Sequence, residues 1–117
     1  MTPARSQSLL WLAQRGSAVV LALCVVVHLG TMIVAVRGGL TAVEILGRTR
    51  GSVAWAAFYI VFVLGVAIHA PIGLRAMLAE MRGRHGRGAD AAMLAFAAML
   101  LTLGLRAVWA VTAGRGT

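Results

Sequence analysis

The segment that decides the fold is residues 51–74, GSVAWAAFYIVFVLGVAIHAPIGL, which has no charged side chain between Arg50 and Arg75. A helix needs ~20 mostly apolar residues to cross the ~30 Å hydrocarbon layer of a bilayer. This segment is longer than that, and in so short a chain only a helix satisfies its own backbone hydrogen bonds in lipid. We therefore predict a transmembrane helix over about 52–78.

A second apolar segment precedes it. Residues 16–36 carry no charge between Arg15 and Arg37, which predicts a span over about 9–36. This run is too long for the core of a signal peptide and has no small-x-small cleavage site, so we expect it to be retained.

A third apolar segment follows. Residues 91–105 are uncharged, and the apolar run resumes after Arg106, which predicts a span over about 89–113. Residues 1–117 thus form one all-α membrane domain with three transmembrane helices.

Composition supports a lipid environment. Hydrophobic residues make up 61% of the chain and charged residues 12%, and the mean hydropathy is +0.91. A soluble domain of this size needs more polar side chains to cover its surface. The single cysteine, Cys24, excludes a disulfide or a thiolate metal site within the chain, and we expect it to be a small buried hydrophobe.

The charge distribution predicts an orientation. The net charge is +8, and all 11 basic residues are arginines that lie between the apolar runs, where they meet lipid phosphates and do not form one face for nucleic acid. Three spans place the N-terminus and the second loop on the same side, which carries the larger share of arginines. The positive-inside rule therefore favours a cytoplasmic N-terminus, in a bacterial inner (plasma) membrane.

Two of the three histidines lie inside the predicted spans. His28 is in the first and His69 in the second, whereas His85 is in the arginine-rich second loop, where we expect it to be solvated. An imidazole in hydrocarbon needs a partner, and neutral imidazole is a good ligand for haem iron. The alternative is a hydrogen bond to a neighbouring helix.

Gly65 and Gly73 lie one turn before and one turn after His69 on the same helical face. Two missing side chains leave a flat slot beside the imidazole, as a porphyrin requires. Close packing of two helices uses small residues at the same spacing, so this alternative stays open.

The depths of the two histidines differ. His28 lies ~20 Å along a helix from Arg15, and His69 ~9 Å from Arg75, while both arginines are predicted on the same side. The depths therefore differ by ~10 Å. We infer that the two histidines serve different haems, each of which needs a second ligand from another chain.

Two motifs resemble a known family. Residues 69–80, HAPIGLRAMLAE, resemble the H-x3-G-x-R-x4-D/E motif of the membrane-anchor cytochrome b subunits of succinate dehydrogenase and fumarate reductase. Residues 14–18, QRGSA, resemble the H-R-x-S/T-G motif that opens their first helix, with Gln14 and Ala18 as departures. With the three spans, the resemblance covers most of residues 9–112.

The resemblance implies roles for several residues. It makes His69 a haem b ligand and places Arg15 near the haem propionates and the quinone pocket, with Ser17 and Trp11 as further candidates for that pocket. In two-haem members, which have five helices, the first-helix histidine binds the distal haem, as His28 would. The chain therefore resembles half of a two-haem anchor, which packs into a haem-binding bundle with a second, similar anchor subunit or a second copy of itself.

Glu44 is an acid among apolar residues near the distal end. Two-haem members have a glutamate in a comparable place that is implicated in the proton chemistry of menaquinol, and an acid beside a quinone can exchange protons. The alternative is a loop acid that pairs with Arg48 at i, i+4.

The function that follows is a membrane anchor without succinate chemistry of its own. It would hold an iron–sulfur subunit and through it a flavoprotein, and relay electrons through haem b, two per anchor pair, to quinone as substrate. The arginines of the second loop would dock the iron–sulfur subunit or bind anionic lipid. Two other hypotheses are a cytochrome b subunit of a hydrogenase or formate dehydrogenase, and a small membrane protein without a redox role.

Overall fold

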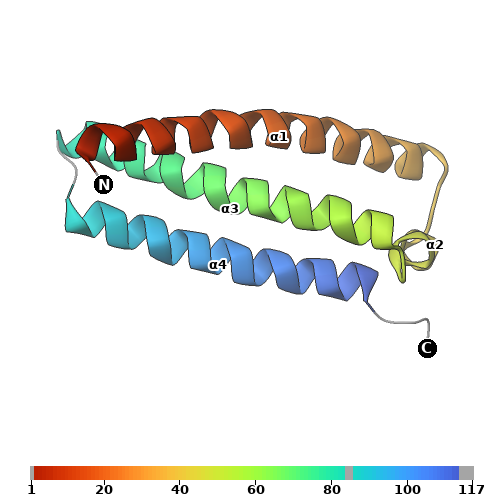
Figure 1. The fold of residues 1–117 in the computed structure, drawn as a ribbon. Coiled ribbons are helices and arrows are strands. Elements are labelled where there is room, and N and C mark those ends of the chain that lie inside the picture. The colour runs from red at the N-terminus through yellow and green to blue at the C-terminus, as the bar shows by residue number, and fades with distance from the viewer. Residues whose placement is uncertain (1, 84–85, 114–117) are drawn as a thin grey trace.

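Three long helices and one short helix make up the part of the chain that the structure describes, residues 2–83 and 86–113 of a computed structural model. The long helices are α1 (Pro3–Arg37), α3 (Val53–Arg82) and α4 (Arg87–Thr112), and the short α2 (Ala42–Thr49) joins α1 to α3. The long helices lie side by side with α3 between α1 and α4 (Figure 1). The described residues contain no strand, so the all-α prediction is confirmed.

The helices are longer than a bilayer requires. All three long helices have the length and apolar composition needed to cross a membrane, as the sequence predicts. The bundle extends 50 × 25 × 24 Å, and its long axis exceeds the ~30 Å hydrocarbon thickness. The bundle therefore projects into the headgroup and aqueous regions, which explains why α1 begins ahead of the predicted span and α3 ends after it.

Side-chain caps and one glycine set the helix ends. The Thr2 Oγ1 accepts a hydrogen bond from the Arg5 N–H at 3.3 Å, and Pro3 follows as the first helical residue. The Ser52 Oγ accepts from the Trp55 N–H at 3.2 Å and starts α3. Gly83 ends α3 with a φ of 72°, a left-handed conformation that favours glycine.

Helix α2 is absent from the sequence prediction, which places no helix between the spans over about 9–36 and 52–78. The Thr41 Oγ1 caps it by accepting from the Glu44 N–H. The helix is too short to span a membrane, so a search for apolar runs passes over it. The Thr49 Oγ1 donates to the Val111 carbonyl at 2.7 Å, and the Gly51 N–H donates to that of Thr112 at 2.7 Å. These bonds fix α2 against the C-terminal end of α4.

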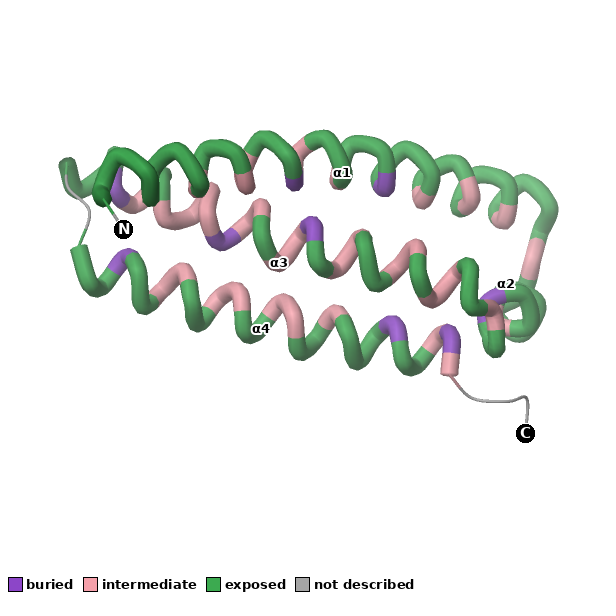
Figure 2. Tube along the Cα trace, in the orientation of Figure 1, coloured by how far each residue is buried: buried purple, intermediate pink, exposed green. Residues whose placement is uncertain are grey.

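Burial is reversed relative to a water-soluble fold. Among the described residues the buried hydrophobic side chains are small (Cys24, Ala79, Ala89 and Val108), and buried polar residues include Ser17 and Thr49. Large apolar side chains such as Val26, at 70% exposure, cover the outside (Figure 2). Such an apolar surface suits lipid or a partner helix and not water. In lipid, helices are held together by packing of small residues and by polar contacts, which explains why small and polar residues are buried between them.

Helix α1 packs on α3 through one narrow seam. The seam residues alternate in steps of three and four, the spacing that lets two helices cross at a shallow angle. Each is buried or half-buried, and most of the polar side chains of the membrane-spanning part of α1 are among them. The seam consists of Gln14, Ser17, Leu21, Cys24, His28, Thr31 and Ala35. The seam therefore turns His28 and Ser17 towards α3.

The contact between α3 and α4 is closer. A Cβ added at Gly104 would lie 2.5 Å from the Val63 Cγ1, so the absence of a side chain at Gly104 lets the two backbones approach. Near the connection between these helices, the Arg75 Nε donates to the Asp90 Oδ1 at 2.7 Å. Arg75 is thus paired within the chain at the end of the bundle that holds the N-terminus of α1.

Candidate functional site

His69 contacts the start of α1. Its Nδ1 lies 3.4 Å from the Ser17 Oγ and 3.4 Å from the Gln14 carbonyl oxygen, both long hydrogen-bonding distances. The Ser17 hydroxyl donates to the same carbonyl at 3.1 Å. A carbonyl oxygen only accepts, so this environment favours the tautomer with the proton on Nδ1 and the lone pair on Nε2.

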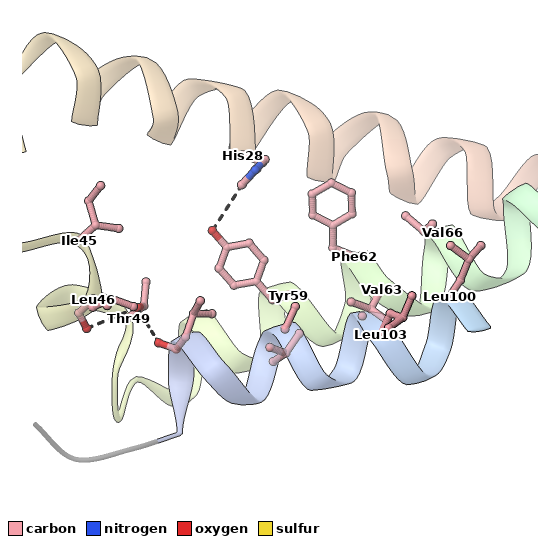
Figure 3. Close-up of a pocket in the computed structure, with 14 residues that line it drawn as sticks. His28, Ile45, Leu46, Thr49, Tyr59, Phe62, Val63, Val66, Leu100 and Leu103 are labelled. Carbon is pink, nitrogen blue, oxygen red and sulfur yellow. Dashed lines mark hydrogen bonds between the residues drawn. The ribbon is translucent and has the colours of Figure 1, made fainter. Parts of the chain in front are cut away.

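His28 contacts an aromatic cluster on α3. Its Nδ1 lies 3.4 Å from the Tyr59 hydroxyl, and its ring meets those of Tyr59 and Phe62 edge to face, with centroids 5.7 and 5.6 Å away. In Figure 3 His28 points from α1 to the Tyr59 hydroxyl, with Phe62 beside it. The α3 aromatics therefore hold the imidazole ring in one orientation.

Both histidines leave the same nitrogen without a partner. Neither Nε2 has a hydrogen-bond partner within the described ranges, and neither is among the fully buried polar atoms that lack one. Each Nε2 is thus not fully buried and has no partner within the described part of the chain. A histidine that binds a metal through Nε2 usually has its Nδ1 held by a neighbouring group, as here.

The two sites lie far apart along the bundle. Ser17 faces His69 and His28 faces Tyr59, so the sites are separated by ~15 Å at ~1.5 Å per residue on both helices. The difference in depth predicted from the sequence is therefore present, and larger than the ~10 Å expected. At this separation, the two imidazoles are too far apart to bind the two faces of a single planar ligand.

Two cavities adjoin His28. One, of about 560 Å³, lies between α2, α3 and α4 and is lined mainly by aliphatic side chains, with Tyr59 and Thr49 as polar members (Figure 3). The other, of about 660 Å³, lies between the C-terminal half of α1, α2 and the start of α3. Both volumes fall in the range of small-molecule sites.

The slot predicted beside His69 is filled within this chain. A Cβ at Gly65 would lie 3.2 Å from the Leu21 Cδ2, and one at Gly73 would lie 3.4 Å from the Gln14 Nε2. Gly65 therefore lets α1 approach α3 closely, whereas the contact at Gly73 is an ordinary one, and side chains of α1 cover both positions. This coverage favours the packing alternative over a porphyrin contact there.

The candidates for the quinone site separate into two groups. Ser17 is buried beside His69, whereas Arg15 is exposed and Trp11 is 63% exposed. Arg15 lies over the Trp11 ring at 5.7 Å from its centroid. Residues two apart on a helix point to nearly opposite sides, so the structure places Ser17 and Arg15 on different faces of α1.

Glu44 is exposed in the first turn of α2. Among the described residues, 2–83 and 86–113, Arg75–Asp90 is the only ion pair within 4.0 Å. The alternative pairing of Glu44 with Arg48 is therefore not present in the structure. His85 lies outside the described residues.

The sequence analysis missed two contacts of the histidines. Tyr59 has no role in the sequence analysis, but its hydroxyl lies 3.4 Å from the His28 Nδ1. The backbone of Gln14 contacts His69, and its buried Oε1 has no hydrogen-bond partner among the described residues. The seam spacing on α1 is the signal that places Gln14 beside Ser17, and an antiparallel pairing of His69 with Ser17 brings Tyr59 to His28.

The donor set suits haem iron better than a bare metal ion. No group of three or more histidine, cysteine or acidic side chains gathers within the described ranges, as a site for an isolated metal would need. A single imidazole at each level would suit a haem iron, because the porphyrin itself would supply most of the ligands.

Comparison with known proteins agrees with this architecture. The model of the succinate dehydrogenase/fumarate reductase transmembrane subunit family matches residues 1–105. No curated protein and no solved structure matches the chain. The match includes both histidines and nearly all of the three membrane-spanning helices. The chain is therefore a multi-pass membrane protein that belongs to the succinate dehydrogenase/fumarate reductase transmembrane subunit family.

Proposed function

We propose that the chain anchors a succinate dehydrogenase or fumarate reductase and relays electrons between its iron–sulfur subunit and quinone through haem b. One observation carries this proposal: two intramembrane imidazoles, at two depths, each have the Nδ1 in contact with a neighbouring helix and the Nε2 without a hydrogen-bond partner among the described residues. The family match supports membership of a succinate dehydrogenase or fumarate reductase complex, in which such groups would carry electrons.

The chain's own residues orient the rings and exclude water. The Gln14 carbonyl and the Ser17 hydroxyl hold the His69 ring, and Tyr59 and Phe62 hold the His28 ring. A haem b bound at each Nε2 supplies reversible one-electron chemistry. A second anchor subunit, similar or identical, would cover the exposed apolar surface and would supply a further ligand to the haem at each level.

The quinone site is proposed at the His69 end, near Ser17 and Gln14. The buried Gln14 Oε1 lacks a donor, and a quinol hydroxyl supplies one. Arg15 and Trp11 lie on the other face of α1, where they meet a propionate, the partner subunit or the headgroups. Glu44, at the opposite end, is exposed and available for proton exchange with quinone there.

The proposed orientation places the N-terminus and the second loop in the cytoplasm of a bacterium. Arg5, Arg15, Arg75, Arg82 and Arg87 lie at this end of the bundle. The iron–sulfur subunit, with the flavoprotein, docks on that side.

A difference spectrum tests the haem proposal. The complex, purified through a tag on this chain, is expected to show a b-type α-band on reduction with dithionite and to contain bound flavin and iron–sulfur clusters. A complex with flavin but no α-band would remove haem from the proposal. Haem without flavin would place the chain in a different dehydrogenase.

Ser17→Ala is expected to alter the haem at His69 without removing it. The variant loses one of the two groups at the His69 Nδ1, while the Gln14 carbonyl still holds the ring. The measurement is the low-spin electron paramagnetic resonance spectrum and the midpoint potential. Ser6→Ala, a change of an exposed serine earlier on α1, serves as the control and should change neither. An unchanged spectrum in Ser17→Ala would show that the hydroxyl does not tune the ligand.

A further inference from the structure

The cavity of about 660 Å³ beside His28 combines three chemical features. The imidazole of His28 lies on its wall inside the bundle. Arg48, in the last turn of α2, lies on its rim at the end of the bundle far from the N-terminus. Trp55 and Tyr59 form an aromatic wall on α3.

The aromatic wall suits a flat ligand. The rings of Trp55 and Tyr59 are stacked, with centroids 5.7 Å apart and planes at 23°. Gly30 also lines the cavity, and a Cβ added there would meet nothing within 4 Å. The cavity thus has an aromatic pair in its lining and free space beside Gly30, which leaves room for a planar conjugated molecule against these rings.

Within residues 2–83 and 86–113, no carboxylate pairs with Arg48. The chain has three acidic residues. Asp90 pairs with Arg75, Glu80 lies near the opposite end of α3, and Glu44 does not pair with Arg48 within 4.0 Å. A guanidinium at the edge of an apolar cavity favours a carboxylate or phosphate, to which it can donate two parallel hydrogen bonds.

We propose that Arg48 binds the carboxylate edge of the planar ligand whose centre is held by His28. The inference rests on the proposed function, in which that ligand is haem b and the carboxylates are its propionates. It orients the propionates of this haem towards α2, away from the N-terminal end of the bundle. The competing role for Arg48 is a contact with lipid phosphates only.

Redox titration of the purified complex tests the proposal. The His28 haem is identified as the signal that disappears in His28→Ala. In Arg48→Gln this signal is expected to shift to lower potential, because a positive charge near the haem favours the reduced form and the variant loses that charge. At a fixed potential, the ratio of reduced to oxidised haem should fall on the order of tenfold. The His69 signal, ~15 Å away, should move less. Arg48→Lys keeps the charge and should retain most of the wild-type potential.

Arg50→Gln is the matched control, because Arg50 is at the same end of the bundle but does not line the cavity. It should leave both potentials unchanged. An unmoved His28 signal in Arg48→Gln, or an equal shift in Arg48→Gln and Arg50→Gln, overturns the role of Arg48 and supports the lipid contact. A wild-type complex without haem would instead refute the proposed function itself.

Discussion

His69→Ala is expected to remove about half of the haem from the complex and to leave the His28 signal in place. The Nδ1 of His69 contacts α1, which leaves the Nε2 as the proposed ligand at this level, and no alanine group replaces it. The His28 site is ~15 Å away on the same two helices and shares none of these contacts. The measurement is the pyridine haemochrome content per complex, with the low-temperature α-band resolving the two signals.

The reciprocal variant completes this test. His28→Ala should remove the other signal, and the double variant should remove both. Cys24→Ala is the control, because Cys24 is buried on the same seam and lines neither cavity beside His28. If the two single variants removed the same signal, both histidines would bind one haem. If His69→Ala kept its full haem content, His69 would not be a haem ligand and its ring would only pack against α1. Membrane insertion of each variant is checked by the yield of the complex.

Gly104→Ala is expected to destabilise the packing of α3 on α4. The added Cβ would lie 2.5 and 2.9 Å from the two Cγ atoms of Val63, closer than such atoms approach in folded proteins. Valine has one strongly preferred χ1 rotamer in a helix, so it cannot turn away cheaply. Overpacking of this kind costs about 1–3 kcal/mol. The apparent melting temperature of the detergent-purified complex should fall by several degrees.

A second-site change identifies the cause. Gly104→Ala combined with Val63→Ala removes both Cγ atoms and should recover much of the lost melting temperature. Gly16→Ala is the matched control, because a Cβ there meets nothing within 4 Å and alanine favours a helix. A melting temperature that stayed unchanged in Gly104→Ala would mean that the helices have room to separate without loss. Equal losses at Gly104 and Gly16 would implicate glycine itself and not the Val63 contact.

The contrast between His69 and its neighbouring glycines shows where sequence reasoning reached its limit. The glycine spacing around His69 is equally compatible with a porphyrin slot and with close helix packing. The positions of Leu21 and Gln14 over these glycines favour packing. The difference lies in which side chains of α1 face α3, and that depends on the register between two helices far apart in sequence.

Local patterns in the sequence determined the spans, the histidines inside them and the difference in their depth, because hydropathy and helical rise depend only on near neighbours. The same is true of the H-x3-G-x-R motif. The tertiary structure alone decided that Tyr59 holds His28, that Gln14 and Ser17 hold His69, and that α2 closes the far end of the bundle. These contacts join residues of different helices, so they exist only once the antiparallel register of α1, α3 and α4 is set by packing.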